Sequence, residues 1–169
     1  MNASGNGRHQ AAAVPTIEER FPRLSAAELL EAGQRQPDWL VGGVLVANQP
    51  MVICGAEKTL KTAVAIDLGL SLVSGAPFLG RYAVARRVNV GMMSGESGAM
   101  TLGETAVRIA AAKGIDLRDY ADSYGTYTTL PMLTRGADLE AVEHIVARDA
   151  LGCIIIDPAY LCMDLDGRE

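Results

Sequence analysis

The sequence has few of the residues that mark several protein classes. It contains three cysteines and no Cys-x-x-Cys pair, which excludes a disulfide framework and gives a zinc site no support. Aromatic residues make up only 5% of the chain, which disfavours an aromatic-rich sandwich. The longest apolar run, 62–78, contains Asp67 and is broken by Gly75 and Pro77. We therefore expect no membrane span.

Positive charge is not in excess either. The formal net charge is −5, which argues against a chain-wide binding surface for nucleic acid but leaves a local one open. No continuous apolar segment follows Arg8 and His9, so no secretory signal is visible. The cysteines are then best interpreted as small apolar residues in a reducing compartment. We expect a cytoplasmic protein.

What the chain does contain favours a layered α/β fold. Hydrophobic residues make up 49% and charged residues 21%, enough apolar material for a packed core, and there are 18 glycines. Apolar runs alternate with helical patterns, which implies a mostly parallel sheet joined by right-handed crossovers. Strands are expected over 51–54, 88–93, 124–130 and 153–156, and helices over 63–73, 101–112 and 138–147.

Local signals suggest how the chain is organised. Ser25 and Glu28 form a capping box that predicts a helix over 25–32, and Thr101 with Glu104 predicts a second helix start. The first residues are rich in Ala, Gly, Asn and Gln and show no periodicity. The expected parts are a disordered lead over 1–22, a short helix and lead-in segment over 23–49, and a nucleotide-binding domain over 50–169.

The most informative segment reads GAEKTLKT and lies between a predicted buried strand and a predicted buried helix. In that context backbone N–H groups and the positive end of a helix form a concavity for polyphosphate. Lys61 would reach the terminal phosphates, and the Thr62 hydroxyl would take a magnesium position. The expected phosphate-binding residues are Gly55, Ala56, Glu57, Lys58, Thr59, Leu60, Lys61 and Thr62.

One position of this loop is unusual, because Leu60 stands where a glycine commonly precedes the lysine. A Cβ there restricts the backbone and its approach to phosphate. The alternative is an ordinary helix start that bears lysines. However, each cation at a helix N-terminus costs about 0.3–1 kcal/mol unless an anion is present. Lys58 and Lys61 together therefore favour the phosphate-binding interpretation.

Two carboxylates follow predicted strands. Asp157 ends the run Ile154–Ile156, at the edge of an open α/β sheet where ligands bind, and could hold the water shell of Mg²⁺ opposite Thr62. Glu96 follows the strand over 88–93 and could polarise an attacking water. The alternatives are a strand-ending aspartate that caps the next turn and an exposed turn glutamate.

Together these segments resemble a RecA-like P-loop ATPase, in the branch that includes RepA-type hexameric helicases and related bacterial AAA-family proteins. The resemblance covers residues 39–164, most of the chain. It rests on the whole set of segments rather than on the loop alone. They are WLV (39–41), GAEKTLKT (55–62), AIDLGLSLVSGAPFLG (65–80), MSGESG (93–98) with the following Thr105, and IIIDPAYL (154–161).

The resemblance implies ATP and Mg²⁺ as cofactors. It implies that Lys61 and Thr62 bind phosphate and magnesium, that Asp157 orders the metal, and that Glu96 activates water. It also implies assembly into a homo-oligomeric ring, with DNA as a possible partner. In the family a further strand, a polar sensor and arginine fingers follow the Asp157 strand, and here they have no candidates. We therefore expect a three-layer RecA-like core that is incomplete at the C-terminus, and nucleotide binding that is weak at best.

Three functions stay open on the sequence. The first is an ATP-hydrolysing motor in DNA replication or mobile-element maintenance. The second is a nucleotide-binding regulatory module without turnover, which Leu60 would suit. The third is a P-loop kinase for a small acceptor, for which no lid and no acceptor pocket can be identified. The sequence leaves undecided whether this chain is itself an active enzyme.

Overall fold

The computed structural model describes residues 16–163, and the chain divides into two units, Met1–Gln36 and Pro37–Glu169. The first unit contains α1 (Ile17–Arg20) and α2 (Ala26–Gly33). The Ser25 hydroxyl accepts the N–H of Glu28, and the Glu28 carboxylate accepts the N–H of Ser25, so the predicted capping box is confirmed. Of the predicted lead over 1–22, residues 1–15 lie outside the described residues.

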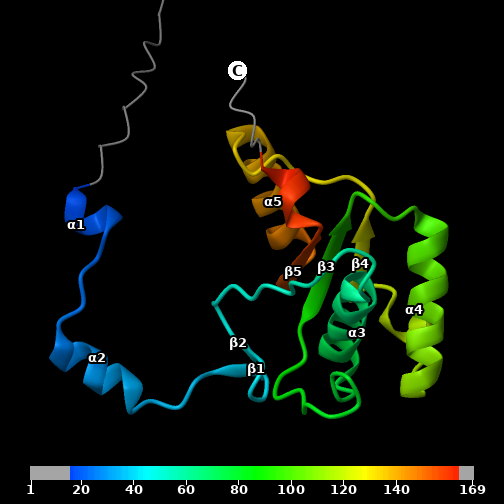
Figure 1. The fold of residues 1–169 in the computed structure, drawn as a ribbon, viewed down its shortest axis with the longest axis horizontal. Helices are drawn as coiled ribbons and strands as arrows, with labels where there is room; N and C mark the ends of the chain where they lie inside the picture. Colours follow the sequence, from blue (N-terminus) through cyan, green and yellow to red (C-terminus); the bar gives the residue numbers. More distant parts are fainter. Residues whose placement is uncertain (1–15, 164–169) are drawn as a thin grey trace, which may run out of the picture. The chain divides into compact units, whose positions relative to one another are not determined.

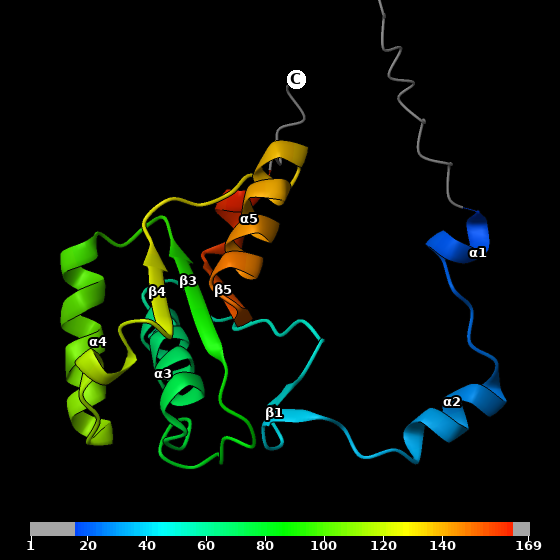
Figure 2. The same cartoon turned by 180° about the vertical axis from the view of Figure 1, so that it is seen from behind.

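The second unit is built on a parallel sheet with strand order β4-β3-β5. Its strands are β3 (Asn89–Ser94), β4 (Tyr124–Tyr127) and β5 (Leu151–Asp157). The helices are α3 (Lys61–Ser74), α4 (Ala99–Lys113) and α5 (Gly136–Arg148). Figures 1 and 2 show α3 and α4 on one side of the sheet and α5 on the other. The predicted α/β fold with helices on both faces of a parallel sheet is confirmed.

Helix α3 is the central element of the core. Its apolar residues occur on most sides, and Ile66, Leu70 and Leu72 are almost completely buried. Gly69 lets the helix approach the sheet closely, since a Cβ at this position would lie 2.6 Å from the ring of Tyr124. The helix ends at Gly75 in the left-handed conformation that glycine adopts without strain. This tight packing fixes the first turn of α3 at the carboxyl edge of the sheet.

The prediction of a buried strand over 51–54 is wrong. The segment pairs with no strand of the described sheet, in which β5 has β3 as its one neighbour. Val52 is 83% exposed, whereas Met51 and Ile53 are partly buried against the core. An apolar run becomes a strand only when another strand satisfies its backbone groups, and a periodicity argument cannot supply that partner. A short hairpin, β1 (Trp39–Val41) with β2 (Leu45–Val46), precedes this segment.

The predicted start of α4 is also wrong. The helix begins after Gly98, which caps it without a side-chain hydrogen bond, so Thr101 lies inside the helix and not at its cap. Glu104 pairs instead with Arg108 one turn later. Because Ala99 and Met100 readily enter a helix, the helix extends one half-turn upstream and the expected capping box cannot form.

The predicted third strand is shorter than expected. β4 stops at Tyr127, and its last register partner is Met93 of β3. Beyond that point the backbone after β3 stays paired with β5, since the N–H of Gly95 donates to the carbonyl of Asp157 at 3.1 Å. The residues after Tyr127 do not continue the ladder with β3.

A buried ion pair joins α4 to α3. The Lys113 ammonium lies 3.1 Å from Asp67 Oδ1 and donates to Ser71 Oγ and to the Pro77 carbonyl, each at 2.8 Å. Its side chain is 7% exposed and that of Asp67 is 16% exposed. The same Asp67 oxygen accepts the N–H of Leu79 at 2.8 Å. One ammonium thus fixes the end of α4, the middle of α3 and the connection that follows α3.

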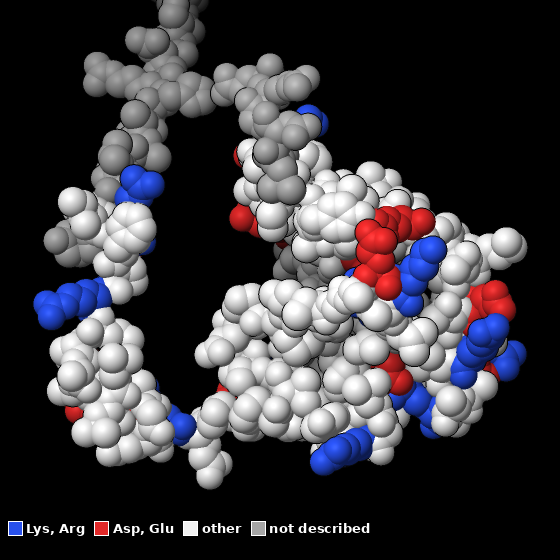
Figure 3. Space-filling view, in the orientation of Figure 1, with Lys and Arg blue, Asp and Glu red and all other residues white. Residues whose placement is uncertain are grey.

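Within residues 16–163, no helix has both the length and the apolar character needed to cross a membrane. On the face of the second unit seen in Figure 3, acidic and basic side chains are interspersed among uncharged ones. This mixed surface agrees with the modest net charge of the sequence.

Candidate functional site

The loop before α3 is closed by its own lysine. The Lys61 ammonium donates to the carbonyls of Ala56 at 2.7 Å and Gly55 at 3.2 Å. The Thr59 hydroxyl also donates to the Ala56 carbonyl, at 2.7 Å. These bonds draw the first residues of the loop onto its last ones. The segment therefore forms a closed turn at the N-terminus of the buried helix.

The backbone conformation of the loop shows how it accommodates Leu60 at the position where a glycine is common. Leu60 has φ −64°, which any L-residue adopts, and it is 78% exposed. The left-handed residue is Lys58, with φ 57°. At Gly55 a Cβ would lie 3.0 Å from the Thr59 hydroxyl, so the absence of a side chain matters there. The side chain of Leu60 thus faces solvent without straining the turn.

The electrostatics of this turn favour an anion. No side chain caps the N-terminus of α3, and its first turn contains no acidic residue. The N–H of Lys61 donates to the Thr59 carbonyl, but the helix dipole still presents positive potential, to which Lys61 and the neighbouring Lys58 add two full charges. Glu57 is the single acidic side chain within the loop.

Thr62 and Asp157 meet across 95 residues of sequence. The Thr62 hydroxyl, in the first turn of α3, donates to Asp157 Oδ2 at 2.7 Å. Asp157 ends β5, so this bond connects the loop and helix to the carboxyl edge of the sheet. The two residues predicted to share a cation are therefore neighbours.

Ser94, which the sequence did not single out, lies beside them. It ends β3 and is in register with Asp157, so the two side chains lie on the same face of neighbouring strands. Ser94 is 1% exposed, and its Oγ has no hydrogen-bond partner among the described residues. The only signal in the sequence was a hydroxyl residue at the end of a predicted strand.

These oxygens fit a magnesium ion. Mg²⁺ prefers hard oxygen ligands, keeps several of its waters and is bound through one or two protein groups together with phosphate. Thr62 and Asp157 supply a hydroxyl and a carboxylate. An unpartnered buried hydroxyl such as that of Ser94 is costly unless a water satisfies it, and a metal-bound water would do so.

Glu96 lies at the same edge of the sheet, because it follows β3 by two residues and β3 neighbours β5. It is exposed, and its Oε1 accepts a hydrogen bond from the hydroxyl of Tyr160 in the 3-10 helix η2 (Ala159–Cys162). That bond raises the pKa of Tyr160, to which slight desolvation and the negative charges of Glu96 and Glu57 also contribute. Tyr160 therefore lies beside Glu96. No role for Tyr160 could be predicted from the sequence.

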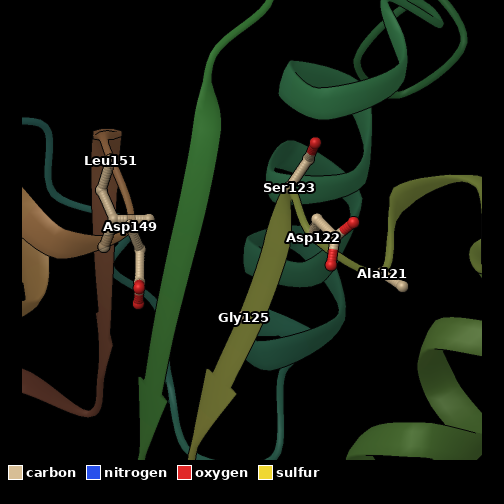
Figure 4. A pocket seen from close by; sticks show the side chains of 6 residues that line it. All are labelled: Ala121, Asp122, Ser123, Gly125, Asp149 and Leu151. Atoms are coloured by element: carbon tan, nitrogen blue, oxygen red, sulfur yellow. The ribbon is translucent and has the colours of Figure 1, made fainter.

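A separate hollow occurs at the opposite edge of the sheet. It has a volume of about 250 Å³ and lies at the amino ends of β4 and β5. Figure 4 shows its lining, with Asp149 and Leu151 on the β5 side and Asp122 and Ser123 on the β4 side. The lining contributes two carboxylates and no cationic side chain, whereas the loop contains Lys58 and Lys61 to attract a polyphosphate. The chemistry of the loop, rather than the size of this hollow, therefore identifies the candidate site.

Comparison with known proteins identifies a family for the chain. The family model of the AAA domain matches residues 15–168, almost the entire chain. Neither the curated proteins nor the solved structures give a significant match. Because the family match spans the loop, both carboxylates and the whole sheet, the chain belongs to the AAA domain family of P-loop ATPases.

Proposed function

We propose that this chain binds MgATP at the turn formed by residues 55–62 and that Glu96 promotes hydrolysis of the terminal phosphate. The observation that carries the proposal is the hydrogen bond between Thr62 and Asp157. This hydrogen bond joins a hydroxyl at the start of α3 to a carboxylate at the end of β5, next to the loop that contains Lys58 and Lys61. Family membership supports nucleotide binding independently.

Each residue has a distinct task in this proposal. The Lys61 ammonium and the N–H groups at the start of α3 bind the phosphate oxygens. Thr62 and Asp157 hold Mg²⁺, which supplies neutralisation of the charge that develops on those oxygens. Glu96 accepts a hydrogen bond from the attacking water and orients it toward phosphorus. The hydroxyl of Ser94 forms a hydrogen bond with a water molecule at the same site.

Nucleotide titration by calorimetry tests the binding step. Lys61→Ala removes a charge-assisted contact, so we expect the Kd for MgATP to rise about tenfold or more. Lys58→Ala is the matched lysine control in the same loop and is expected to have a smaller effect. Arg108→Ala, on the exposed face of α4, should leave the Kd unchanged. Equal Kd values for wild type and Lys61→Ala would contradict the site.

Phosphate release distinguishes turnover from binding alone. We expect Mg²⁺-dependent release by the wild type, with losses in Lys61→Ala and Glu96→Gln. If the wild type binds MgATP but releases phosphate no faster than a solution without enzyme, the chain is a regulatory module.

The cellular setting is a further part of the proposal. Resemblance to RepA-type helicases supports a ring of identical subunits and a role with DNA in replication. The local basic residues Arg81, Arg86 and Arg87 are the candidates for contact with a DNA backbone. The three free cysteines suit a cytoplasmic protein. Light scattering with and without MgATP, and DNA binding by the triple Arg→Ala variant, test these points.

A further inference from the structure

The structure restrains the backbone of the turn that contains Glu96. The side chain of Glu96 receives its restraint from outside this turn. The N–H of Gly95 donates to the Asp157 carbonyl at 3.1 Å. A Cβ at Gly95 would clash with the side chain of Leu130, so that side chain packs directly over the turn. Glu96 itself is exposed. An exposed glutamate has several rotamers, and holding it in one of them has an entropic cost.

Tyr160 supplies the missing restraint. Its hydroxyl donates to one oxygen of the Glu96 carboxylate, Oε1. A carboxylate offers about four acceptor sites on its two oxygens, so this bond leaves the other oxygen free to accept from water. The hydroxyl therefore restricts the orientation of the carboxylate without occupying all of its acceptor sites.

The element that carries Tyr160 is itself held firmly. η2 begins two residues after Asp157, which ends β5. At its other end Cys162 is completely buried, and the Cys162 carbonyl accepts the N–H of Leu133 at 2.8 Å. Tyr160 therefore stands on a short segment that is anchored on both sides. Through it, the position of Glu96 depends on the position of Asp157.

We infer that Tyr160 is a positioning residue for the reaction, holding Glu96 so that its free oxygen receives the attacking water. This role rests on the proposed function. It adds a third side chain to the pair of carboxylates and joins the strand that carries the metal ligand to the turn that carries the base. In this role Tyr160 acts through Glu96.

Tyr160→Phe tests the role, since it removes the hydroxyl and keeps the ring. We expect kcat for phosphate release to fall about tenfold or more, because small misplacement of a catalytic group costs up to about a hundredfold. The KM for MgATP should stay within about twofold, since the phosphate-binding residues are unchanged. Tyr82→Phe, whose ring packs near Phe78, is the matched control and should keep the wild-type kcat.

A second measurement needs no activity. In protein labelled with 3-fluorotyrosine, the ¹⁹F resonance of Tyr160 is identified by its loss in Tyr160→Phe. Glu96→Gln removes both the acceptor charge and its attraction for the phenolic proton, so the pKa of Tyr160 should fall toward its ordinary value. Glu104→Gln, the same change on exposed α4, should leave that pKa unchanged.

The outcomes separate this inference from the proposed function. An active wild type with an equally active Tyr160→Phe overturns the positioning role and leaves the proposed function standing. A Tyr160 pKa that does not respond to Glu96→Gln overturns the contact itself, whatever the activity. A wild type that releases no phosphate overturns the proposed hydrolysis and the positioning role with it. A lower kcat, an unchanged KM and a lower phenol pKa together support the inference.

Discussion

Replacing Lys113 with methionine removes one charge from the ion pair between α3 and α4 and keeps most of the side-chain volume. In the wild type the ammonium has three acceptors, on Asp67, Ser71 and Pro77, and is 7% exposed. In the variant, the Asp67 carboxylate, whose side chain is 16% exposed, keeps the N–H of Leu79 and the Ser71 hydroxyl as donors but has no ion-pair partner among residues 16–163. The perturbation therefore isolates the charge rather than the packing.

The expected loss of stability follows from that burial. Removing one partner of a buried ion pair costs about 3–5 kcal/mol, because the remaining charge is left uncompensated. The partial exposure of Asp67 and its remaining N–H donor favour the lower end of this range. A domain of this size is stable by about 5–15 kcal/mol in total, so the variant should lose a large share of its free energy of unfolding.

Urea unfolding followed by far-ultraviolet circular dichroism measures this loss. Arg108→Met is the matched control, because it breaks the Arg108–Glu104 pair on the same helix, where the side chains are 75% and 64% exposed. That exposed pair should contribute about 0.2–1 kcal/mol at most. Adding Asp67→Asn to Lys113→Met removes the stranded charge and should recover part of the loss. If Lys113→Met destabilises the protein no more than Arg108→Met, the pair is not buried in solution and the packing of α4 on α3 is wrong.

Two other predictions concern the loop. Of the three cysteines, Cys54 is exposed beside the loop, whereas burial raises the pKa of the Cys153 thiol to about 11 and also raises that of Cys162. At mildly alkaline pH, Ellman's reagent should modify Cys54 first, and mass spectrometry would locate the modified cysteine. Saturating MgATP should slow the modification of Cys54. Rapid modification of Cys153 would contradict the burial of β5. Leu60→Gly should change the Kd for MgATP by less than about threefold, because the φ of Leu60 is already compatible with any residue and glycine adds only its entropic cost. A large gain in affinity on calorimetry would show instead that the leucine side chain obstructs phosphate.

The parts of the fold that the sequence predicts well are those controlled by neighbouring residues. Ser25 and Glu28 interact within one helical turn, so their residue types alone determine the cap. The all-round apolar pattern of residues 63–73 requires burial, and α3 is indeed the centre of the core. The carboxyl edge of a parallel sheet collects the residues that end its strands, which is why Asp157 could be expected at the edge where ligands bind.

The parts that the sequence does not predict depend on distant partners. Residues 51–54 have the composition of a strand, but pairing requires a neighbour that composition cannot identify. The hydrogen bond from Tyr160 to Glu96 spans 64 residues and follows no spacing rule. The unpartnered hydroxyl of Ser94 is a property of its surroundings, since a serine at the end of a strand is ordinarily hydrated.

The bonds from Lys61 to the carbonyls of its own loop have a consequence for the kinetics of ligand capture. The ammonium spans the turn before any nucleotide arrives, so the turn is already ordered. Much of the conformational entropy that a floppy loop would lose on association has then been lost during folding. A polyphosphate that recruits the ammonium must compete with these two carbonyls for it, so ligand capture should include an exchange of the bonds from Lys61 as well as diffusional encounter.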